Sequence, residues 1–486
     1  MTRVCVIGAG AAGLCAARHL LVEPSVATVD VLEQAAQLGG TWVYTENVGY
    51  DDFGLPIHTS MYKSLRTNLP KEIMGFPDFP VPESEKSYLP AKDMLAFLQL
   101  YSDKNGVTPY IKFKHHVQLV KPKEGPNGEL WDVSFKDLTT GVSETREYDY
   151  VFVCNGHYNT PFIPSIPGLK EFKGDVMHSH DYRVPDLFTG KRVLVIGAGP
   201  SGMDIALEVT SVAQKVVLSH HLSERPRTVF PDNLVQKPDV ERLDGNTAYF
   251  KDGSEEEVDV VFLCTGYMYN FPFLHESCGI VVKENCVEPL YKHLVNIHHP
   301  TMCLVGVPYY VCAFSMFDLQ VRYYVQAMKG VFSLPRRDEM LRHRRREVRE
   351  RAARGLTRRQ AHMMGPAQAG YYDSLSQESG AAPLPPVLTE VHNDSSLKFL
   401  HNLTHYRDDV YRLIDNNSFV CYQERYYASL ASEAGTKNLP SVITKIREES
   451  SIRFLHNLKH YRQDVYKIID DNTYEVISNG KSEILC

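Results

Sequence analysis

The sequence lacks the cysteine spacing of a zinc site or of a redox-active pair. Its ten cysteines are scattered along 486 residues, and no two of them form a CxxC motif. Zinc sites and the disulfide frameworks of small secreted domains need such clustered cysteines. We therefore expect reduced, buried cysteines, and we predict no metal site.

Long apolar runs are also absent. The longest run, TMCLVGVPYYVCAFSMF at 301–317, contains Pro308 and stops at Asp318, short of the roughly 20 residues that a spanning helix needs. We expect it to form a buried strand and turn. The N-terminal apolar run is broken at once by GAGAAG, and the last residues, DDNTYEVISNGKSEILC, form no apolar helix. The prediction is a cytoplasmic protein without a transmembrane segment, with peripheral membrane association left open.

The charge balance gives no attraction toward nucleic acid. The net charge is −7, and the one arginine-dense stretch, 336–359, is interspersed with Glu and Asp and has no aromatic residues for base stacking. It is more typical of a solvated helix with i,i+4 ion pairs. We predict no nucleic-acid partner.

At 43% apolar residues, the chain suits an α/β protein of two or three domains.

Two almost identical glycine-rich stretches stand out: RVCVIGAGAAGLCAA at 3–17 and RVLVIGAGPSGMDIA at 192–206. Each follows a β-branched run and precedes helix-forming residues, the context that a dinucleotide-binding turn requires. In such a turn the first glycine permits the tight bend, the second lets the backbone approach a pyrophosphate, and the third lets helix and strand pack closely. The predicted cofactor-binding residues are Gly8, Gly10 and Gly13 in the first stretch and Gly197, Gly199, Ser201 and Gly202 in the second.

The residues after the next predicted strand assign the two ligands. The first copy is followed by VATVDVLEQ, ending in Glu33, whose carboxylate can hold the ribose diol of FAD or NAD. The second is followed by KVVLSHHLSERPR, which has no acid at that place and offers Arg225 and Arg227 to a 2′-phosphate. We predict FAD at the first and NADPH at the second. His220 and His221 could equally be solvated loop residues.

Several further segments resemble one family. FKGDVMHSHDY at 172–182 is similar, through Phe172, Gly174, His178 and Tyr182, to the identifying pattern FxGxxxHxxx[FY] of the flavin-containing monooxygenases. Related Baeyer–Villiger enzymes have Trp where this chain has Tyr182. LGGTW (38–42), YKSLRTNLPKEIMGFPDFP (62–80), FLCTGYMYNFPFL (262–274), FDLQVRYYVQAMKG (317–330) and QAHMMGPAQAGYYDSL (360–375) resemble other segments of that family in the same order. The chain thus resembles a flavin-containing monooxygenase of the soluble, insect-like type that forms N-oxides.

The resemblance implies roles for particular residues. It places Gly40, Thr41, Trp42, Thr67 and Gln320 at the cofactor, and Asn68 at the flavin as the catalytic residue. Several of the residues in these segments could also have a purely structural role. Trp42 and Tyr182 could be core aromatics, His178 a structural histidine, and Asn68 a turn-capping asparagine.

The resemblance also implies a mechanism. NADPH reduces FAD, dioxygen forms a flavin 4a-hydroperoxide, and an amine nitrogen or sulfide sulfur takes the distal oxygen. The predicted partners are this small-molecule substrate and O2, with a homo-oligomer left open. The alternatives are a Baeyer–Villiger monooxygenase, an NADPH oxidase and, from another class, an NADPH sensor without turnover.

We predict an α/β fold with two Rossmann-like domains, the NADPH domain inserted in the FAD domain. The expected FAD domain comprises 1–167 and 286–420, and the NADPH domain 168–285. SLKFLHNLTHYRDDVYRLIDNNSF at 396–419 recurs as SIRFLHNLKHYRQDVYKIIDDNTY at 451–474, which predicts a helical C-terminal tail with an internal repeat and a duplicated element at 421–486.

Overall fold

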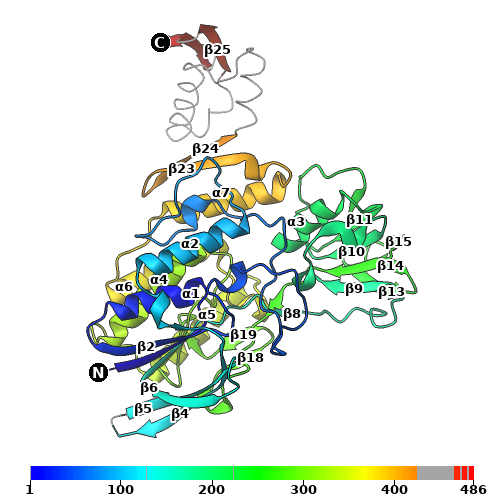
Figure 1. Ribbon diagram of the computed structural model, residues 1–486. Coiled ribbons are helices and arrows are strands. Elements are labelled where there is room, and N and C mark those ends of the chain that lie inside the picture. The colour runs from blue at the N-terminus through cyan, green and yellow to red at the C-terminus, as the bar shows by residue number, and fades with distance from the viewer. Residues whose placement is uncertain are drawn as a thin grey trace.

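The computed structural model describes residues 2–126, 128–222 and 224–423, together with three C-terminal strands within 465–485. Two large sheets, one mostly and one fully parallel, organise the described residues (Figure 1). A glycine-rich turn follows one strand of each sheet. The predicted α/β class with two dinucleotide-binding units is confirmed.

The first sheet has seven strands, and its β-branched segments are buried on both sides, as expected of parallel strands. Five neighbouring strands, β22, β7, β1, β2 and β3, pair parallel to one another. The order is β20 (Leu290–Tyr291), β21 (Val295–Asn296), β22 (Met302–Leu304), β7 (Tyr150–Val153), β1 (Thr2–Ile7), β2 (Val26–Leu32) and β3 (Ile111–Lys112).

The second sheet has five parallel strands and lies beside the first, on the right in Figure 1. Its order is β12 (Leu234–Lys237), β11 (Lys215–Ser219), β10 (Arg192–Ile196), β16 (Val260–Leu263) and β9 (Asp175–His178). In both sheets the strand before the glycine turn has its successor on one side and a later strand on the other. That is the switch point at which open α/β sheets bind ligands.

Small antiparallel units complete the sheets. One is β4 (His115–Gly125), β5 (Gly128–Asp137) and β6 (Ser143–Tyr148), and another is β13 (Val240–Asp244), β14 (Thr247–Phe250) and β15 (Glu255–Glu257). A third pairs β18 (Val281–Lys283) with β19 (Cys286–Glu288). The two segments that cross between the large sheets also pair with each other, as β8 (Thr160–Pro161) and β17 (Tyr267–Met268).

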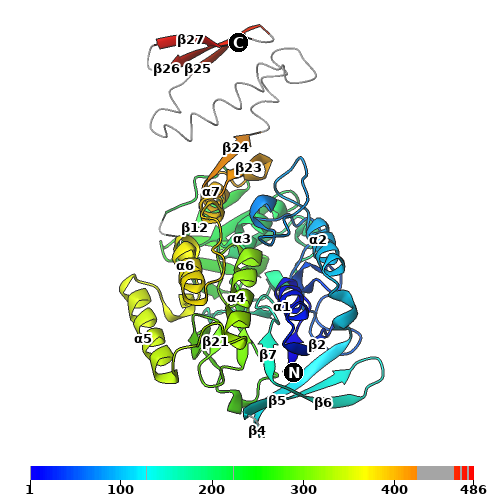
Figure 2. The ribbon, with the colours of Figure 1, turned by 90° about the vertical axis from the view of Figure 1, so that its left-hand side faces the viewer.

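Helices cover the first sheet and form the C-terminal region (Figure 2). They are α1 (Ala11–Leu21), α2 (Ala91–Lys104), α4 (Ala313–Met328), α5 (Arg337–Ala353), α6 (Gln368–Ser379) and α7 (Val387–His401), while α3 (Pro200–Val209) belongs to the second sheet. The apolar run at 301–317 forms β22 and a turn, as expected, but its last residues, 313–317, begin α4. In the part of the chain that the structure describes, none of the helices has the length and apolar content to cross a membrane.

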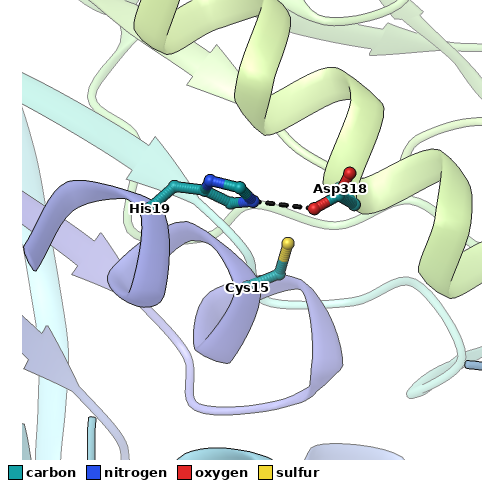
Figure 3. A group of neighbouring side chains, drawn as sticks. All are labelled: Cys15, His19 and Asp318. Carbon is teal, nitrogen blue, oxygen red and sulfur yellow. Dashed lines mark hydrogen bonds and ion pairs between the residues drawn. The ribbon is translucent and has the colours of Figure 1, made fainter. Parts of the chain in front are cut away.

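A polar group around the buried Cys15 and Asp318 joins α1 to α4 (Figure 3). Nε2 of His19 lies 2.7 Å from Oδ1 of Asp318, and Nε of Arg322 donates to the other carboxylate oxygen at 2.6 Å. The thiol of Cys15 lies within 4.8 Å of the ligand atoms of His19 and Asp318. Burial raises the pKa of Cys15 well above its usual value, so the thiol stays protonated and is a poor metal ligand. We interpret the group as a tie between two helices.

The arginine-rich helix α5 differs from the expectation of a solvated helix. It carries the expected i,i+4 pair between Arg346 and Glu350, but Arg344 and Arg351 are buried. Both contact Glu347, which also pairs with the buried His293. One face of α5 is therefore a buried network of charges rather than a solvated surface.

The first repeat copy is only partly helical. Helix α7 ends at His401, and the chain continues through η9 (Tyr406–Asp408) into a hairpin of β23 (Asp409–Asp415) and β24 (Ser418–Gln423). Val410, in the tail expected to be helical, lies in β23, where β-branched and aromatic residues pair well across strands. The boundary expected at 420/421 falls inside β24. Much of the second copy lies outside the described residues, apart from the backbone of β25 (Val465–Asp470), β26 (Thr473–Ser478) and β27 (Lys481–Leu485).

Candidate active site

The two glycine turns are built alike. Gly8 and Gly197 have φ angles of 101° and 107°, which an L side chain rarely adopts. A Cβ atom at Gly8 would stand 2.7 Å from the carbonyl oxygen of Cys154, and one at Gly197 would stand 2.5 Å from that of Cys264. Each turn therefore rests on the loop that leaves the neighbouring parallel strand, β7 or β16.

Each turn leaves a helix N-terminus available to an anion. The N-cap residues of α1 and α3, Gly10 and Gly199, provide no side-chain cap, and neither helix has an acidic residue in its first turn. A Cβ atom at Gly199 would meet no atom within 4 Å, and one at Gly10 would meet only Gly40, at 3.5 Å from its Cα. Free amides facing open space fit the pyrophosphate of a dinucleotide. Ser201 lies in the first turn of α3 and is half-buried.

Glu33 and His220 occupy equivalent places. The amide of Gly8 donates to the carbonyl of Leu32 at the end of β2, and the amide of Gly197 donates to that of Ser219 at the end of β11. The next residue is Glu33 in the first unit and His220 in the second. The structure thus puts a carboxylate beside one turn and an imidazole beside the other.

The Glu33 carboxylate is buried against the first turn. Its oxygens accept the amides of Ala9 at 2.7 Å and Ala35 at 2.8 Å. Burial raises the pKa of Glu33 above its usual value, although these backbone donors oppose the shift. The carboxylate therefore has a fixed orientation next to the turn, as a ribose-binding acid requires.

Cationic side chains lie near His220. Its Nε2 contacts Oε1 of Gln236 at 3.1 Å, and the carbonyl of Gln236 accepts from Arg225 at 3.4 Å. Arg227 is exposed and paired with Glu224 at 2.6 Å. His221 is exposed beside Asp239, which fits the solvated alternative for that histidine. The structure brings Arg225 close to the end of β11, while Arg227 needs to leave Glu224 to reach a phosphate there.

The LGGTW segment lies directly against the first turn. The amide of Gly39 donates to the carbonyl of Ala9, and a Cβ atom at Gly40 would stand 3.0 Å from the Cα of Gly10. Thr41 and Trp42 continue in η1 (Gly40–Trp42). Oγ1 of Thr41 is buried without a hydrogen-bond partner. Such an atom is costly unless a ligand or water satisfies it, so this segment fits a bound cofactor.

Asn68 is exposed at the end of a well-fixed segment. The preceding residue, Thr67, is buried, its amide donates to the carbonyl of Leu89, and its Oγ1 accepts the amide of Leu89. Asn68 itself lies in a bend, not within a helix or strand. Its side chain thus stands on a rigid base and is accessible.

Gln320 supports the site from behind. It is fully buried on α4, its Oε1 accepts the amide of Gly306, and its Nε2 donates to the hydroxyl of Tyr371 at 2.7 Å. Gly306 follows β22 and lines a small pocket, partly open to solvent and with room for little more than a water molecule, together with Asn155 and His157 just after β7. Gln320 therefore fixes the loop that bounds this pocket.

The identifying motif at 172–182 is structural. Nδ1 of His178 accepts the amide of His180 and its Nε2 lies 3.1 Å from the carbonyl of Gly266, so the ring is a neutral donor and acceptor. Burial lowers the pKa of His178 to about 4. The ring of Tyr182 is buried beside Tyr62, and its hydroxyl donates to Glu208. The geometry therefore fits a structural histidine at His178 and a core aromatic at Tyr182.

No sequence motif pointed to two further arginines, the buried Arg183 and the half-buried Arg407. Arg183 donates to five backbone carbonyls, of Thr45, Asn47, Thr59, His180 and Tyr182, and no motif marked it. Arg407 binds Asp204 and the carbonyls of Arg66 and Thr67. The only signal for Arg407 was its place in the sequence repeat.

The chain matches one protein family and several known proteins. The family described as flavin-binding monooxygenase-like matches residues 1–224 and 222–414. Senecionine N-oxygenase of Tyria jacobaeae is 36% identical over 425 residues, 86% of this chain and 91% of that protein. The Arabidopsis thaliana flavin-containing monooxygenase FMO GS-OX5 is 37% identical over 78% of this chain and 85% of its own. The structure of S-allyl-L-cysteine S-oxygenase from Allium sativum superposes with a TM-score of 0.78 at 32% identity, covering 84% of this chain and 95% of that one.

Proposed function

The chain belongs to the flavin-binding monooxygenase-like family, and from that premise we propose that it uses FAD and NADPH to transfer one oxygen atom from O2 to an amine nitrogen or a sulfide sulfur. It is a flavin-dependent monooxygenase, an oxidoreductase. The electron donor, the form of the activated oxygen and the substrate class are the parts proposed here.

The observation that carries the proposal is the asymmetry between two matching turns. Both present free helix amides, but one has the buried acid Glu33 beside it and the other has His220 with Arg225 nearby. An acid suits an unmodified ribose, whereas a cationic site suits a 2′-phosphate. Assigning FAD to the first turn and NADPH to the second accounts for both the acid and the cationic side chain.

The domain limits follow from this assignment. We propose that residues 1–167 and 286–420 hold FAD and that residues 168–285 hold NADPH. The strands of the first sheet come from the two outer ranges, and the strands of the second sheet come from the inner one. This division places one nucleotide on each sheet.

The residues present fit the flavin nucleotide. Gly8, Gly10 and the α1 amides would hold its pyrophosphate, Glu33 its ribose, and Thr41, with its unpaired hydroxyl, a polar atom of the cofactor. The bound flavin would supply the oxygen-transfer chemistry, which the family resemblance assigns to a 4a-hydroperoxide. The protein's contribution is then position, hydrogen bonds and exclusion of water.

Asn68 has the properties that a hydrogen-bonding role at the reacting centre needs. Its amide has donors and an acceptor, it is exposed, and Thr67 holds it in place. It needs no proton-transfer pKa for this work. We propose that it orients the activated oxygen and the oxidised nicotinamide cofactor.

The substrate class rests on two relatives. One is named an N-oxygenase and the other an S-oxygenase, and both names describe attack by a soft nucleophile on an electrophilic oxygen. We therefore propose an amine or a sulfide as the substrate.

The purified protein tests the proposal directly. It should carry a yellow flavin spectrum, oxidise NADPH far faster than NADH, and, mixed with NADPH in air, form a long-lived oxygenated flavin that decays faster when a tertiary amine or sulfide is added. NADPH oxidation that yields only peroxide with every amine and sulfide tried would make it an oxidase. A colourless protein that binds NADPH without turnover would make it a sensor.

A further inference from the structure

Arg407 lies where three segments of the chain meet. Its guanidinium donates to both carboxylate oxygens of Asp204, at 2.5 and 3.0 Å, and to the carbonyls of Arg66 at 3.1 Å and Thr67 at 3.2 Å. The side chains of Arg407 and Asp204 are 19% and 12% exposed. A planar fork of five N–H donors can make such a set of bonds, and a lysine cannot.

Two of the partners of Arg407, Asp204 and Thr67, belong to segments of the proposed site. Asp204 lies on α3, whose N-terminus forms the second glycine turn, and Tyr62 also donates to its Oδ2. Thr67 directly precedes Asn68. Arg407 therefore joins the helix assigned to NADPH to the backbone that carries Asn68.

The position of Arg407 is itself fixed. The neighbouring Tyr406 is fully buried, with its ring 5.0 Å from that of Tyr88 and 5.4 Å from that of Phe399. The amide of Tyr411 donates to Oγ of Ser87 at 2.8 Å. The guanidinium thus extends from an anchored element of the C-terminal region.

We propose that Arg407 is a positioning residue for oxygen transfer, which keeps Asn68 in register with the NADPH-binding helix. The inference rests on the proposed function. Without Arg407, the carbonyls of residues 66 and 67 lose their tie to α3 and Asn68 can shift relative to the cofactors. A displacement of about 1 Å can cost about 10²-fold in a positioned reaction.

The test uses the flavin-loaded, full-length protein with Arg407→Ala and Arg407→Lys. Arg412→Ala is the control, because Arg412 is exposed on β23, the strand that follows η9. Flavin content and the rate of flavin reduction by NADPH should stay at the wild-type level in all three. In Arg407→Ala, the oxygenated flavin should decay about 10²-fold faster and peroxide should replace product. Arg407→Lys should be intermediate.

A second measurement does not depend on turnover. Hydrogen exchange in the peptide spanning residues 62–70 should rise in Arg407→Ala and stay unchanged in Arg412→Ala. If Arg407→Ala fails to fold, Arg407→Lys and Asp204→Asn decide the matter by the same two readouts.

The outcomes separate the two proposals. A wild-type protein that forms no oxygenated product contradicts the proposed function. If the wild type forms oxygenated product, the role of Arg407 depends on two readouts in Arg407→Ala: the coupling of NADPH use to product, and hydrogen exchange in residues 62–70. The role is overturned if both stay unchanged even after Arg462, its counterpart in the repeat, is also replaced.

A different observation concerns the sequence repeat. Hairpin β23–β24 pairs Val410 with Tyr422, and hairpin β25–β26 pairs Val465 with Ile477. The two hairpins match strand for strand at an offset of 55 residues (410 and 465), including the irregularity before Asp415 and Asp470. Within the described residues, the second hairpin thus has the same pairing as the first.

The residues that anchor the first copy recur in the second. Tyr406, Arg407 and Tyr411 correspond to Tyr461, Arg462 and Tyr466. We further propose that the second unit, residues 424–478, can replace the first, residues 369–423, on the surface formed by Ser87, Tyr88 and Asp204. The surface accepts one unit at a time.

Two deletions of equal length test this exchange. Removing 369–423 places the second unit directly after Gln368, where the first began, and removing 424–478 leaves the first in place. Both proteins should be soluble and flavin-loaded, and removing 369–478 should give apoprotein. If deletion of 369–423 gives apoprotein or aggregate while deletion of 424–478 does not, the units are not interchangeable.

Discussion

The second glycine turn offers a prediction in which ligand binding and folding can be separated. At Gly199 a Cβ atom would meet nothing within 4 Å, and its φ of −74° suits any residue. At Gly202, three residues later, a Cβ atom would stand 1.8 Å from the carbonyl oxygen of Gly197. The same substitution, Gly→Ala, therefore has different consequences at the two positions.

Gly199→Ala should leave the fold intact. Alanine lowers the entropy of the unfolded chain, which stabilises by about 0.4–1 kcal/mol, and it is a poorer N-cap than glycine by a similar amount, so stability should change by less than about 1 kcal/mol. The new methyl group occupies the space through which the backbone would approach a pyrophosphate. We expect NADPH affinity to fall by at least about tenfold, since about 1.4 kcal/mol of lost contact suffices.

Gly202→Ala should damage the fold itself. Its methyl group would need to move by more than 1 Å from the carbonyl of Gly197, because 3.0–3.4 Å is already a tight Cβ contact. Overpacking of this kind costs about 1–3 kcal/mol or more, so the melting temperature should fall and flavin reduction should suffer only as a result.

The assay is stopped-flow reduction of the bound flavin against NADPH concentration, beside thermal melting of each variant. Gly10→Ala is the matched variant in the first turn, where the nearest atom would lie at 3.5 Å, and it should lose flavin while NADPH binding persists. Unchanged NADPH affinity in a well-folded Gly199→Ala protein would refute the idea that the pyrophosphate lies against this turn.

Three further predictions concern single groups. Asn68→Ala should keep FAD and consume NADPH but lose product by about 10²–10³-fold and release peroxide, and product still matched to NADPH use would leave Asn68 a turn residue. Arg225→Ala with Arg227→Ala should weaken NADPH binding and spare NADH, so equal losses for both nucleotides would mean that these arginines do not read the 2′-phosphate. Burial acts to raise the pKa of Asp318, but His19 and Arg322 outweigh it and hold the pKa below its usual value. The carboxylate therefore stabilises the fold above the unfolded-state pKa and loses this effect as the pH falls, so Asp318→Asn should lower the melting temperature at pH 7, by the equivalent of about 3–5 kcal/mol for a broken buried pair, and less at pH 3. A pH-independent difference would contradict that account.

The sequence predicted what depends on local patterns. A β-branched run, a glycine turn and helix formers specify one another within about fifteen residues, so both turns could be predicted, as could the acid Glu33 after the first and the lack of an acid after the second. The structure identifies His220 as the residue in the matching place. The burial of α5 could not be predicted, because Arg344 and Arg351, besides pairing with Glu347 on the same helix, donate hydrogen bonds to Cys286 and Met363 on distant segments. A charge pattern along one helix does not reveal such partners.

The repeat shows the opposite limit. The spacing of Leu400, Leu403 and Val410 fits a helix, yet β23 pairs with β24 because the duplicated segment can close a hairpin through the turn at Asn416 and Asn417. Short apolar runs fit both periods. The role of Arg407 also stayed hidden, since its partners lie on segments far away in the chain.

The pairing of β8 with β17 bears on how such a protein could have arisen. The chain leaves the first sheet near Thr160 and returns near Met268, and these residues are cross-strand partners; the amide of Phe162 also donates to the carbonyl of Gly266 at 2.9 Å. The ends of the intervening segment therefore lie side by side. A folded unit with adjacent termini can be spliced into a surface loop of another with little loss of chain entropy. Because the entering and leaving segments lie together, the nucleotide unit could be removed, exchanged or transferred as a whole. One sequence could have been copied, inserted and then altered beside its glycine turn to take a second ligand.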